Sequence, residues 1–170
     1  MTKIELKFGL SLGAGICIYT LIAHLLGFYT TNIQAGKYGD IVVIALPIVM
    51  IFLAIRAIRA RDGSLTFLKG LKTGLSVALI SFPISAGFLW FYHHFVNPGW
   101  LESILSYERQ WMEASGISAA EIGVRLDQIR SGNSDFAQVI GGLVGTVVLG
   151  LIISAISSVA LRRSHGEDPK

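Results

Sequence analysis

The sequence predicts an all-α integral membrane bundle of four transmembrane helices, with an extracytoplasmic amphipathic helical hairpin between the third and fourth spans. Only 15% of the 170 residues are charged, whereas soluble chains average about 25%, and the mean hydropathy is +0.62. Four apolar stretches are long enough to cross a hydrocarbon core about 30 Å thick, which takes roughly 20 helical residues. The basic residues gather on one side of these stretches. We therefore expect a single membrane domain over residues 1–170.

The first two spans are predicted at residues 8–28 and 41–58. The first follows a basic segment, as a signal peptide would, but it is too long and lacks a small-x-small cleavage site. We therefore interpret it as a retained helix. Pro47 lies inside the second span and predicts a bend, because proline removes one backbone hydrogen bond. Residues 29–39, which contain two glycines, are predicted to form a loop between the spans.

The third and fourth spans are predicted at residues 71–96 and 136–161. Ser64 or Thr66 can cap the start of the third helix, and Pro83 predicts a bend within it. Small residues one turn apart leave a groove into which a neighbouring helix can pack closely. Such pairs occur at three places: Gly9 and Gly13, Gly70 and Gly74, and Gly141 and Gly145.

Residues 98–132 are predicted to form the hairpin of two amphipathic helices. Apolar side chains recur at steps of three and four in the first helix, and Ser118 with Glu121 forms a capping-box pattern before the second. The apolar stripe can lie on the membrane surface, cap its own bundle, or dock a protein partner or a second copy. The candidate contact residues on this stripe are Trp100, Ile104, Trp111 and Met112.

Charge is divided unevenly between the two sides of the spans. Ten of the 14 Lys and Arg residues, but only four of the 11 acidic residues, fall in the N-terminus, the second inter-span segment and the C-terminal tail. Because cytoplasmic loops collect positive charge, both termini are expected in the cytoplasm and the hairpin outside. All three tryptophans fall on the opposite side, where amphipathic rings prefer the membrane–water interface.

The basic segment between the second and third spans is a candidate lipid contact. Arg56, Arg59 and Arg61 could bind anionic headgroups, each contributing about 1 kcal/mol near the surface. Their topogenic role alone is the simpler explanation. The same reasoning explains the small basic excess of the whole chain, so we expect the bilayer as a partner and not nucleic acid.

Histidine and cysteine give little support to a metal site. His24, His93 and His94 lie near the outer ends of the first and third spans and could approach one another as ligands. Histidines that face water and lipid headgroups explain this pattern better, so no metal or cofactor is predicted. Cys17 is the only cysteine, which excludes an intrachain disulfide.

The spans carry no Asp, Glu, Lys or Arg away from their ends. This argues against a proton-coupled transporter, which normally holds a carboxylate inside the membrane. Ion binding by backbone carbonyls at the Pro47 and Pro83 bends stays compatible with the sequence. The serines within the spans lie outside any Gly-x-Ser-x-Gly pattern, so no enzyme is predicted.

Two segments carry a resemblance to a known family. Residues 62–75 read DG-x-L-T-F-x-x-G-L-K-T-G-L, and residues 97–122 read N-P-x-x-L-E…Y…W-M-E-A-S-G-I-S-A-A-E-I. With the four spans, they resemble bacterial membrane proteins catalogued as domain of unknown function 4199. The resemblance covers nearly the whole chain and implies a bacterial inner-membrane location, but it implies no activity and no catalytic residues.

We therefore expect a multi-pass inner-membrane protein that acts as a non-enzymatic accessory, assembly or interaction protein. Its small-residue faces and outer hairpin would make the contacts. The alternative is a small oligomeric transporter or channel subunit, which the two predicted helix bends suggest. Because four spans rarely enclose a pathway, a homodimer would be expected in that case.

Overall fold

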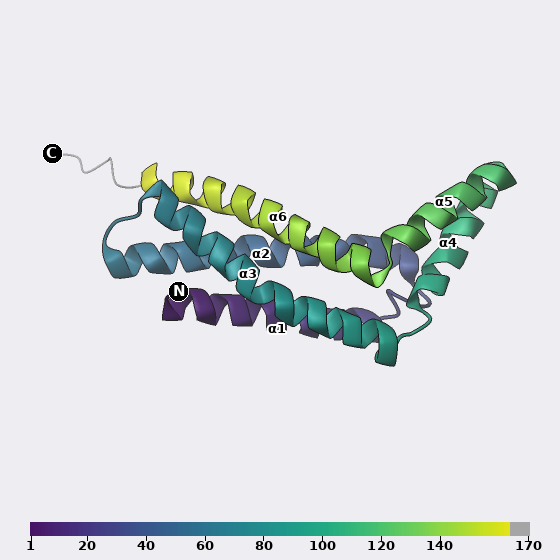
Figure 1. Cartoon of the computed structure of the whole chain (residues 1–170), viewed down its shortest axis with the longest axis horizontal. Helices are drawn as coiled ribbons and strands as arrows, with labels where there is room; N and C mark the ends of the chain where they lie inside the picture. The colour runs from purple at the N-terminus through teal and green to yellow at the C-terminus, as the bar shows by residue number, and fades with distance from the viewer. Residues whose placement is uncertain (164–170) are drawn as a thin grey trace.

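The chain is helical throughout the part that the structure describes. The computed structural model describes residues 1–163, without the side chains at positions 37, 40, 162 and 163, so the predicted polar tail lies outside it. The elements are α1 (Lys3–Leu25), α2 (Ile33–Asp62), α3 (Phe67–Phe91), the π-helical turn η1 (Tyr92–Val96), α4 (Trp100–Ala114), α5 (Ala119–Gly132) and α6 (Asp135–Arg163). Figure 1 shows α1, α2, α3 and α6 running lengthwise together, with α4 and α5 at one end.

The predicted four-span architecture is confirmed. Four helical segments are long and apolar enough to cross a membrane: Lys3–Leu25, Ile33–Asp62, Phe67–Val96 and Asp135–Leu161. The N-terminus, the α2–α3 turn and the end of α6 lie at one end of the bundle, and the hairpin lies at the other (Figure 1). Large apolar side chains such as Ile18, Leu25 and Ile156 are exposed along the bundle, as expected for a surface that contacts lipid.

The first helix begins well before its predicted start at residue 8. Thr2 and Glu5 form a capping box: the backbone N–H of Glu5 donates to Thr2 Oγ1 at 3.2 Å, and the Thr2 N–H donates to Glu5 Oε2 at 2.5 Å. These bonds satisfy backbone donors that the first turn of a helix leaves without partners. The helix therefore starts in the polar segment at Lys3.

The predicted loop at residues 29–39 is too long: residues 29–32 lie outside the helices, but α2 already begins at Ile33. Gly36 and Gly39 suggested a loop, but both are close-contact positions within the helix. A β-carbon at Gly36 would lie 2.6 Å from the Phe28 carbonyl oxygen, and one at Gly39 would lie 3.1 Å from the Phe28 ring. Glycine is therefore used here to let the start of α2 pass directly over Phe28.

Neither internal proline ends its helix. α2 continues through Pro47 and α3 through Pro83, and Figure 1 shows α3 changing direction part-way along its length. The turn between the two helices follows the expected chemistry. Gly63 closes α2 with φ of 71°, a left-handed conformation that favours glycine, and Thr66 caps α3 by accepting from the Lys69 N–H at 3.3 Å.

The bundle core lies around α3, which contacts α1, α2 and α6. Its buried apolar side chains come from all four long helices: Leu12, Ile51, Ala54, Ile55, Val77, Ala78 and Ile153. Lipid tails are as apolar as these side chains, so close van der Waals packing, and not water exclusion, must hold the spans together. The small residues that permit close packing are therefore decisive for this fold.

The hairpin α4–α5 has a small core of its own. Leu105 and Met112 from α4 pack against Ile122 and Leu126 from α5. Gly116, with φ of 75°, makes the turn between the helices. The hairpin rises obliquely from the end of the bundle and projects beyond it (Figure 1). It is therefore a nearly self-contained unit attached to the bundle at its base.

The predicted capping box of α5 is only half formed. Ser118 Oγ accepts from the Glu121 N–H at 3.4 Å, but the Glu121 side chain does not return to the cap. Instead it pairs with Arg125 at 2.6 Å, one turn further along the helix. A second ion pair, Arg130 with Glu102 at 3.1 Å, links the two helices of the hairpin.

Candidate functional site

Two of the three predicted glycine pairs lie at close helix contacts. A β-carbon at Gly9 would lie 2.6 Å from Ile80 Cβ, so α1 and α3 approach each other there. Gly13 repeats this contact one turn on, 2.9 Å from Ile84 Cβ. On the other face of α3, Gly70 and Gly74 meet Ser158 and Ser154 of α6: a β-carbon at either glycine would overlap the serine hydroxyl. α3 therefore uses glycine to approach α6, and α1 uses glycine to approach α3.

The third pair, Gly141 and Gly145, does not pack within the chain. A β-carbon at either position would have no described neighbour within 4 Å. α6 instead turns Gly150 toward Ala78, whose Cβ would lie 2.9 Å from a β-carbon there, and Gly142 toward Phe82. The packed ridge of α6 thus passes one residue away from the predicted pair, about 100° around the helix. In the sequence, this packed ridge is marked by the small residues that recur at positions 142, 150, 154 and 158.

A buried polar network lies where the bundle meets the hairpin. Tyr92 is 1% exposed, and its hydroxyl is hydrogen-bonded to His24 Nδ1 of α1 at 2.8 Å. Asn97 is also buried and donates from Nδ2 to the Tyr92 hydroxyl oxygen at 3.3 Å. Because Asn97 supplies this hydrogen, the phenolic hydrogen can point at His24. The network therefore ties the end of α3 to the end of α1.

The histidines after Tyr92 tie α3 to two further helices. His93 stacks on Trp100 of α4, with ring centroids 4.1 Å apart. His94 stacks on Trp90 at 4.7 Å and lies 3.4 Å from Asp135. Both residues belong to the π-helical turn, in which the Asn97 N–H reaches back to the Tyr92 carbonyl at 2.8 Å. Such turns often mark functional positions.

The three histidines do not converge on one point, since each has a different partner. His24 binds Tyr92, His93 stacks on Trp100, and His94 stacks on Trp90. Within the described residues, no group of three His, Cys, Asp or Glu side chains is placed to hold a metal ion. The histidines instead connect helices, and in this role they join the hairpin to the bundle.

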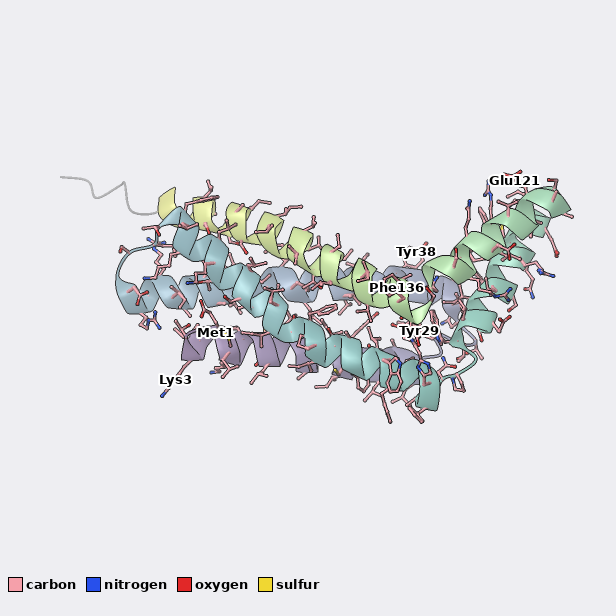
Figure 2. All side chains as sticks on the ribbon, viewed as in Figure 1. Met1, Lys3, Tyr29, Tyr38, Glu121 and Phe136 are labelled. Carbon is pink, nitrogen blue, oxygen red and sulfur yellow. The ribbon has the colours of Figure 1, made fainter. Side chains whose placement is uncertain are left out.

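A small apolar pocket of about 190 Å³ opens beside this junction. Figure 2 shows Tyr29, one of its lining residues, where the bundle meets the hairpin, and Glu121 at the far end of the hairpin. The pocket lies between the end of α1, the end of α3 and the first turn of α4. Its lining residues are Thr20, Tyr29, Leu89, Tyr92, His93, Trp100 and Ile104.

The predicted contact residues of the hairpin are divided between its base, its core and its surface. Trp100 and Ile104 line the pocket at the base. Met112 is 2% exposed and packs inside the hairpin core, away from the surface where a contact was predicted. Trp111 is 53% exposed. The buried residues of α4 are Leu105 and Met112, each one position after a residue of the predicted stripe. The buried face is therefore rotated relative to the prediction, and Trp111 lies on the surface.

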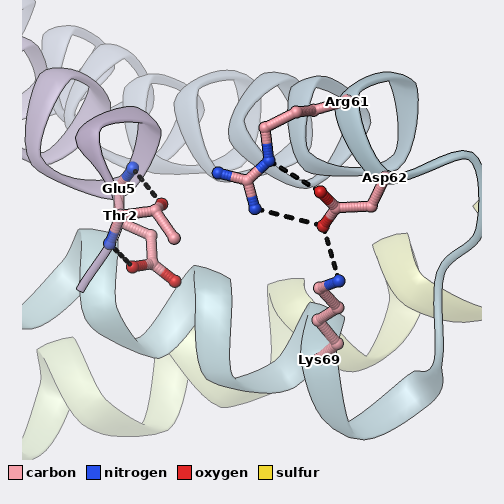
Figure 3. Close-up of polar contacts among 5 residues, drawn as sticks. All are labelled: Thr2, Glu5, Arg61, Asp62 and Lys69. Carbon is pink, nitrogen blue, oxygen red and sulfur yellow. Dashed lines mark hydrogen bonds and ion pairs between the residues drawn. The ribbon is translucent and has the colours of Figure 1, made fainter.

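The basic end of the bundle lies opposite the hairpin. Asp62 holds two of its cations: it pairs with Arg61 at 2.7 Å and with Lys69 at 2.5 Å (Figure 3). Arg56 is exposed, whereas Arg59 is half-buried. Because Asp62 neutralises part of the charge at the α2–α3 turn, Arg56 has more of its charge available to solvent or lipid than Arg61.

A comparison with protein families gives a match over most of the chain. Residues 7–163 match the model of the family described as Protein of unknown function (DUF4199). The chain belongs to this family. The match covers the hairpin and nearly all of the four spans of the DUF4199 chain, so the junction around Tyr92 lies inside the family domain. Searches of curated proteins and of solved structures found no match.

Proposed function

We propose that this DUF4199 protein is a non-enzymatic accessory or assembly protein of the membrane that contacts a partner through its α4–α5 hairpin. The observation that carries the proposal is that the hairpin closes its own core around Leu105 and Met112 yet leaves Trp111 exposed at 53%. Exposed tryptophan on a rigid helix is a frequent anchor of protein interfaces. Trp111 belongs to α4 of the hairpin, which projects beyond the bundle (Figure 1).

The polar side chains at the junction bind one another, which supports a structural role for them. His24, Tyr92 and Asn97 satisfy one another, and His94 faces Asp135. A catalytic base would need to reach a substrate proton, whereas these side chains hold helix ends together. This arrangement favours a scaffold that presents the hairpin in a fixed position.

The proposed setting is the bacterial inner membrane, with both termini in the cytoplasm. The end of the bundle that carries Lys3, Arg61 and Lys69 would face the cytoplasm, and the hairpin would face outward. The positive-inside rule supports this orientation. The described N-terminus, the α2–α3 turn and the end of α6 share one end of the bundle, which is compatible with it.

One observation favours the alternative, a small oligomeric transporter or channel subunit. The face of α6 that carries Gly141 and Gly145 is open, since neither glycine has a described neighbour. A second copy of the chain could pack closely on that face. In that case a pathway would form between copies, because one bundle is filled by its own core.

The proposal is tested by extracting the protein in native-lipid particles and determining the mass of the proteins that co-purify with it. We expect a stoichiometric second protein with the wild-type chain, and its loss with Trp111→Glu, which replaces the exposed ring by a charge. Gln128→Glu adds the same charge at an exposed position of α5 and should retain the partner. A homo-oligomer without any second protein would reject the accessory function and favour the transporter.

A further inference from the structure

A second cleft, of about 380 Å³, opens at the hairpin end of the bundle between the α1–α2 connection and the first turns of α4. We call it the neutral cleft. Its lining residues are Thr30, Thr31, Asn32, Ile33, Gln34, Ser103, Ser106, Tyr107 and Gln110. Eight of these nine side chains end in a hydroxyl or an amide, and none is ionised at neutral pH. The volume lies within the range of ordinary ligand sites.

The neutrality of this cleft is local to one side of α4. The groove that follows the α4–α5 hairpin on another side, about 570 Å³ in volume, is lined by Glu102, Arg109, Glu113, Asp127 and Arg130 among its ten residues. Charged side chains therefore line one groove and are absent from the described lining of the other, although Ser106 and Gln110 border both.

The neutral cleft has unused hydrogen-bonding capacity. The exposed amides of Asn32, Gln34 and Gln110 make no hydrogen bond to the described residues, and the Asn32 side chain does not cap α2. Ser103 Oγ donates to the Gly99 carbonyl at 3.1 Å, which leaves the lone pairs of its oxygen free to accept. The cleft thus offers both donors and acceptors without a net charge.

The neutral cleft and the apolar pocket share two segments, the α1–α2 connection and α4, although α1, α3 and η1 line the pocket as well. Tyr29 and Thr30 are adjacent in the α1–α2 connection, and Trp100 and Ile104 alternate with Ser103 and Tyr107 along α4. A ligand with a neutral polar part in the cleft could therefore place an apolar part near the pocket. Aromatic side chains such as Trp100 are common at the level of lipid headgroups.

We propose that the neutral cleft binds a neutral polyhydroxylated ligand, the carbohydrate of a soluble oligosaccharide or of a glycolipid headgroup. A charged ligand would find no opposite side-chain charge in the described lining, and an apolar one would leave the amides without partners, which is costly. A sugar supplies many hydroxyls that donate and accept, and it presents C–H faces that can pack on Tyr107. The inference does not depend on the hairpin's proposed protein contact.

The test uses the full chain in phosphatidylcholine nanodiscs, because alkyl glycoside detergents carry the same kind of headgroup. Maltotriose and triacetylchitotriose are the soluble probes, followed by saturation-transfer NMR. In the second arm, nanodiscs with and without a diglucosyl diacylglycerol are compared by native mass spectrometry. Saturable binding in either arm is expected, and the arm that gives it identifies the source of the carbohydrate.

Variants decide whether the bound sugar occupies this cleft. Gln34→Leu and Ser103→Ala each remove hydrogen-bonding groups from its lining and should weaken binding by roughly two- to tenfold. Glu113→Gln, in the charged groove on the same hairpin, should leave binding unchanged, and melting temperatures confirm that each variant is folded. The proposal is overturned by an absence of binding at millimolar concentration in both arms, by equal loss in Glu113→Gln, or by displacement of the sugar with inorganic phosphate.

Discussion

Gly74→Ala should destabilise the bundle by about 3 kcal/mol, at the upper end of the usual cost of overpacking. The added methyl group would lie 2.7 Å from Ile51 Cγ2 of α2 and 2.8 Å from Ser154 Cβ of α6. A Cβ atom is fixed by its backbone, so relief requires α3 to separate from α6. Denaturant-induced unfolding in lipid bicelles would measure the change in the free energy of unfolding.

Gly87→Ala is the matched control for this prediction. It adds the same methyl group to the same helix, but a β-carbon at Gly87 has no described neighbour within 4 Å. Its effect should stay within about 0.5 kcal/mol, and the better helix propensity of alanine favours a small gain. Equal destabilisation by both substitutions would mean that α3 does not approach α6 through Gly74.

Tyr92→Ala is expected to cost about 3–5 kcal/mol of unfolding free energy, the usual range for removing a large buried aromatic side chain. The ring is 1% exposed and packs against His24, Tyr29 and Phe88. Tyr92→Phe keeps the ring but removes the hydroxyl that His24 and Asn97 share. It should cost about 1–3 kcal/mol, because the buried Asn97 and the half-buried His24 each lose a partner.

Tyr38→Phe provides the comparison, since Tyr38 is exposed at 72% and loss of its hydroxyl should change stability little. The same unfolding assay applies to all three variants. If Tyr92→Phe matched Tyr38→Phe, the hydrogen-bonded network would contribute nothing to the junction. If it matched Tyr92→Ala, the loss would come from the hydroxyl alone and not from the ring.

Span number was predictable from the sequence, whereas helix ends were not. Twenty or so apolar residues indicate a span regardless of what it packs against. Helix ends depend on local contacts: the Thr2–Glu5 capping box extends α1, and the close contact of Gly36 with Phe28 extends α2 into the predicted loop. Glycine in a loop and glycine at a close helix contact look the same in sequence.

The periodicity of small and apolar residues predicted that α6 and α4 each have a packing face, but it did not predict which face of the helix is buried. On α6 the pattern at Gly141 and Gly145 lies one residue from the packed ridge through Gly150. On α4 the seam through Met112 lies one residue from the stripe that includes Trp111. Apolar residues occur on more than one face of each helix, so the neighbours that choose the buried face must be known first.

The junction network was only partly visible in the sequence. The sequence places His24 and His93 near the outer ends of the first and third spans, where they could approach each other. The bond from His24 goes to Tyr92 instead, and His93 turns to Trp100. The π-helical turn explains why His93 faces Trp100 and not His24, because it changes the direction of the side chains after Tyr92. The sequence shows no cap or proline within that turn.

We propose that the hairpin lies on the outer side of the membrane, and thiol labelling tests this orientation most directly. In a Cys17→Ser background, Ser115→Cys places one thiol at the hairpin turn and Ser64→Cys places one at the α2–α3 turn, both at exposed positions. A membrane-impermeant maleimide applied to intact spheroplasts should label position 115 at once and position 64 only after lysis. Labelling of position 64 in intact spheroplasts, with position 115 protected, would contradict the account.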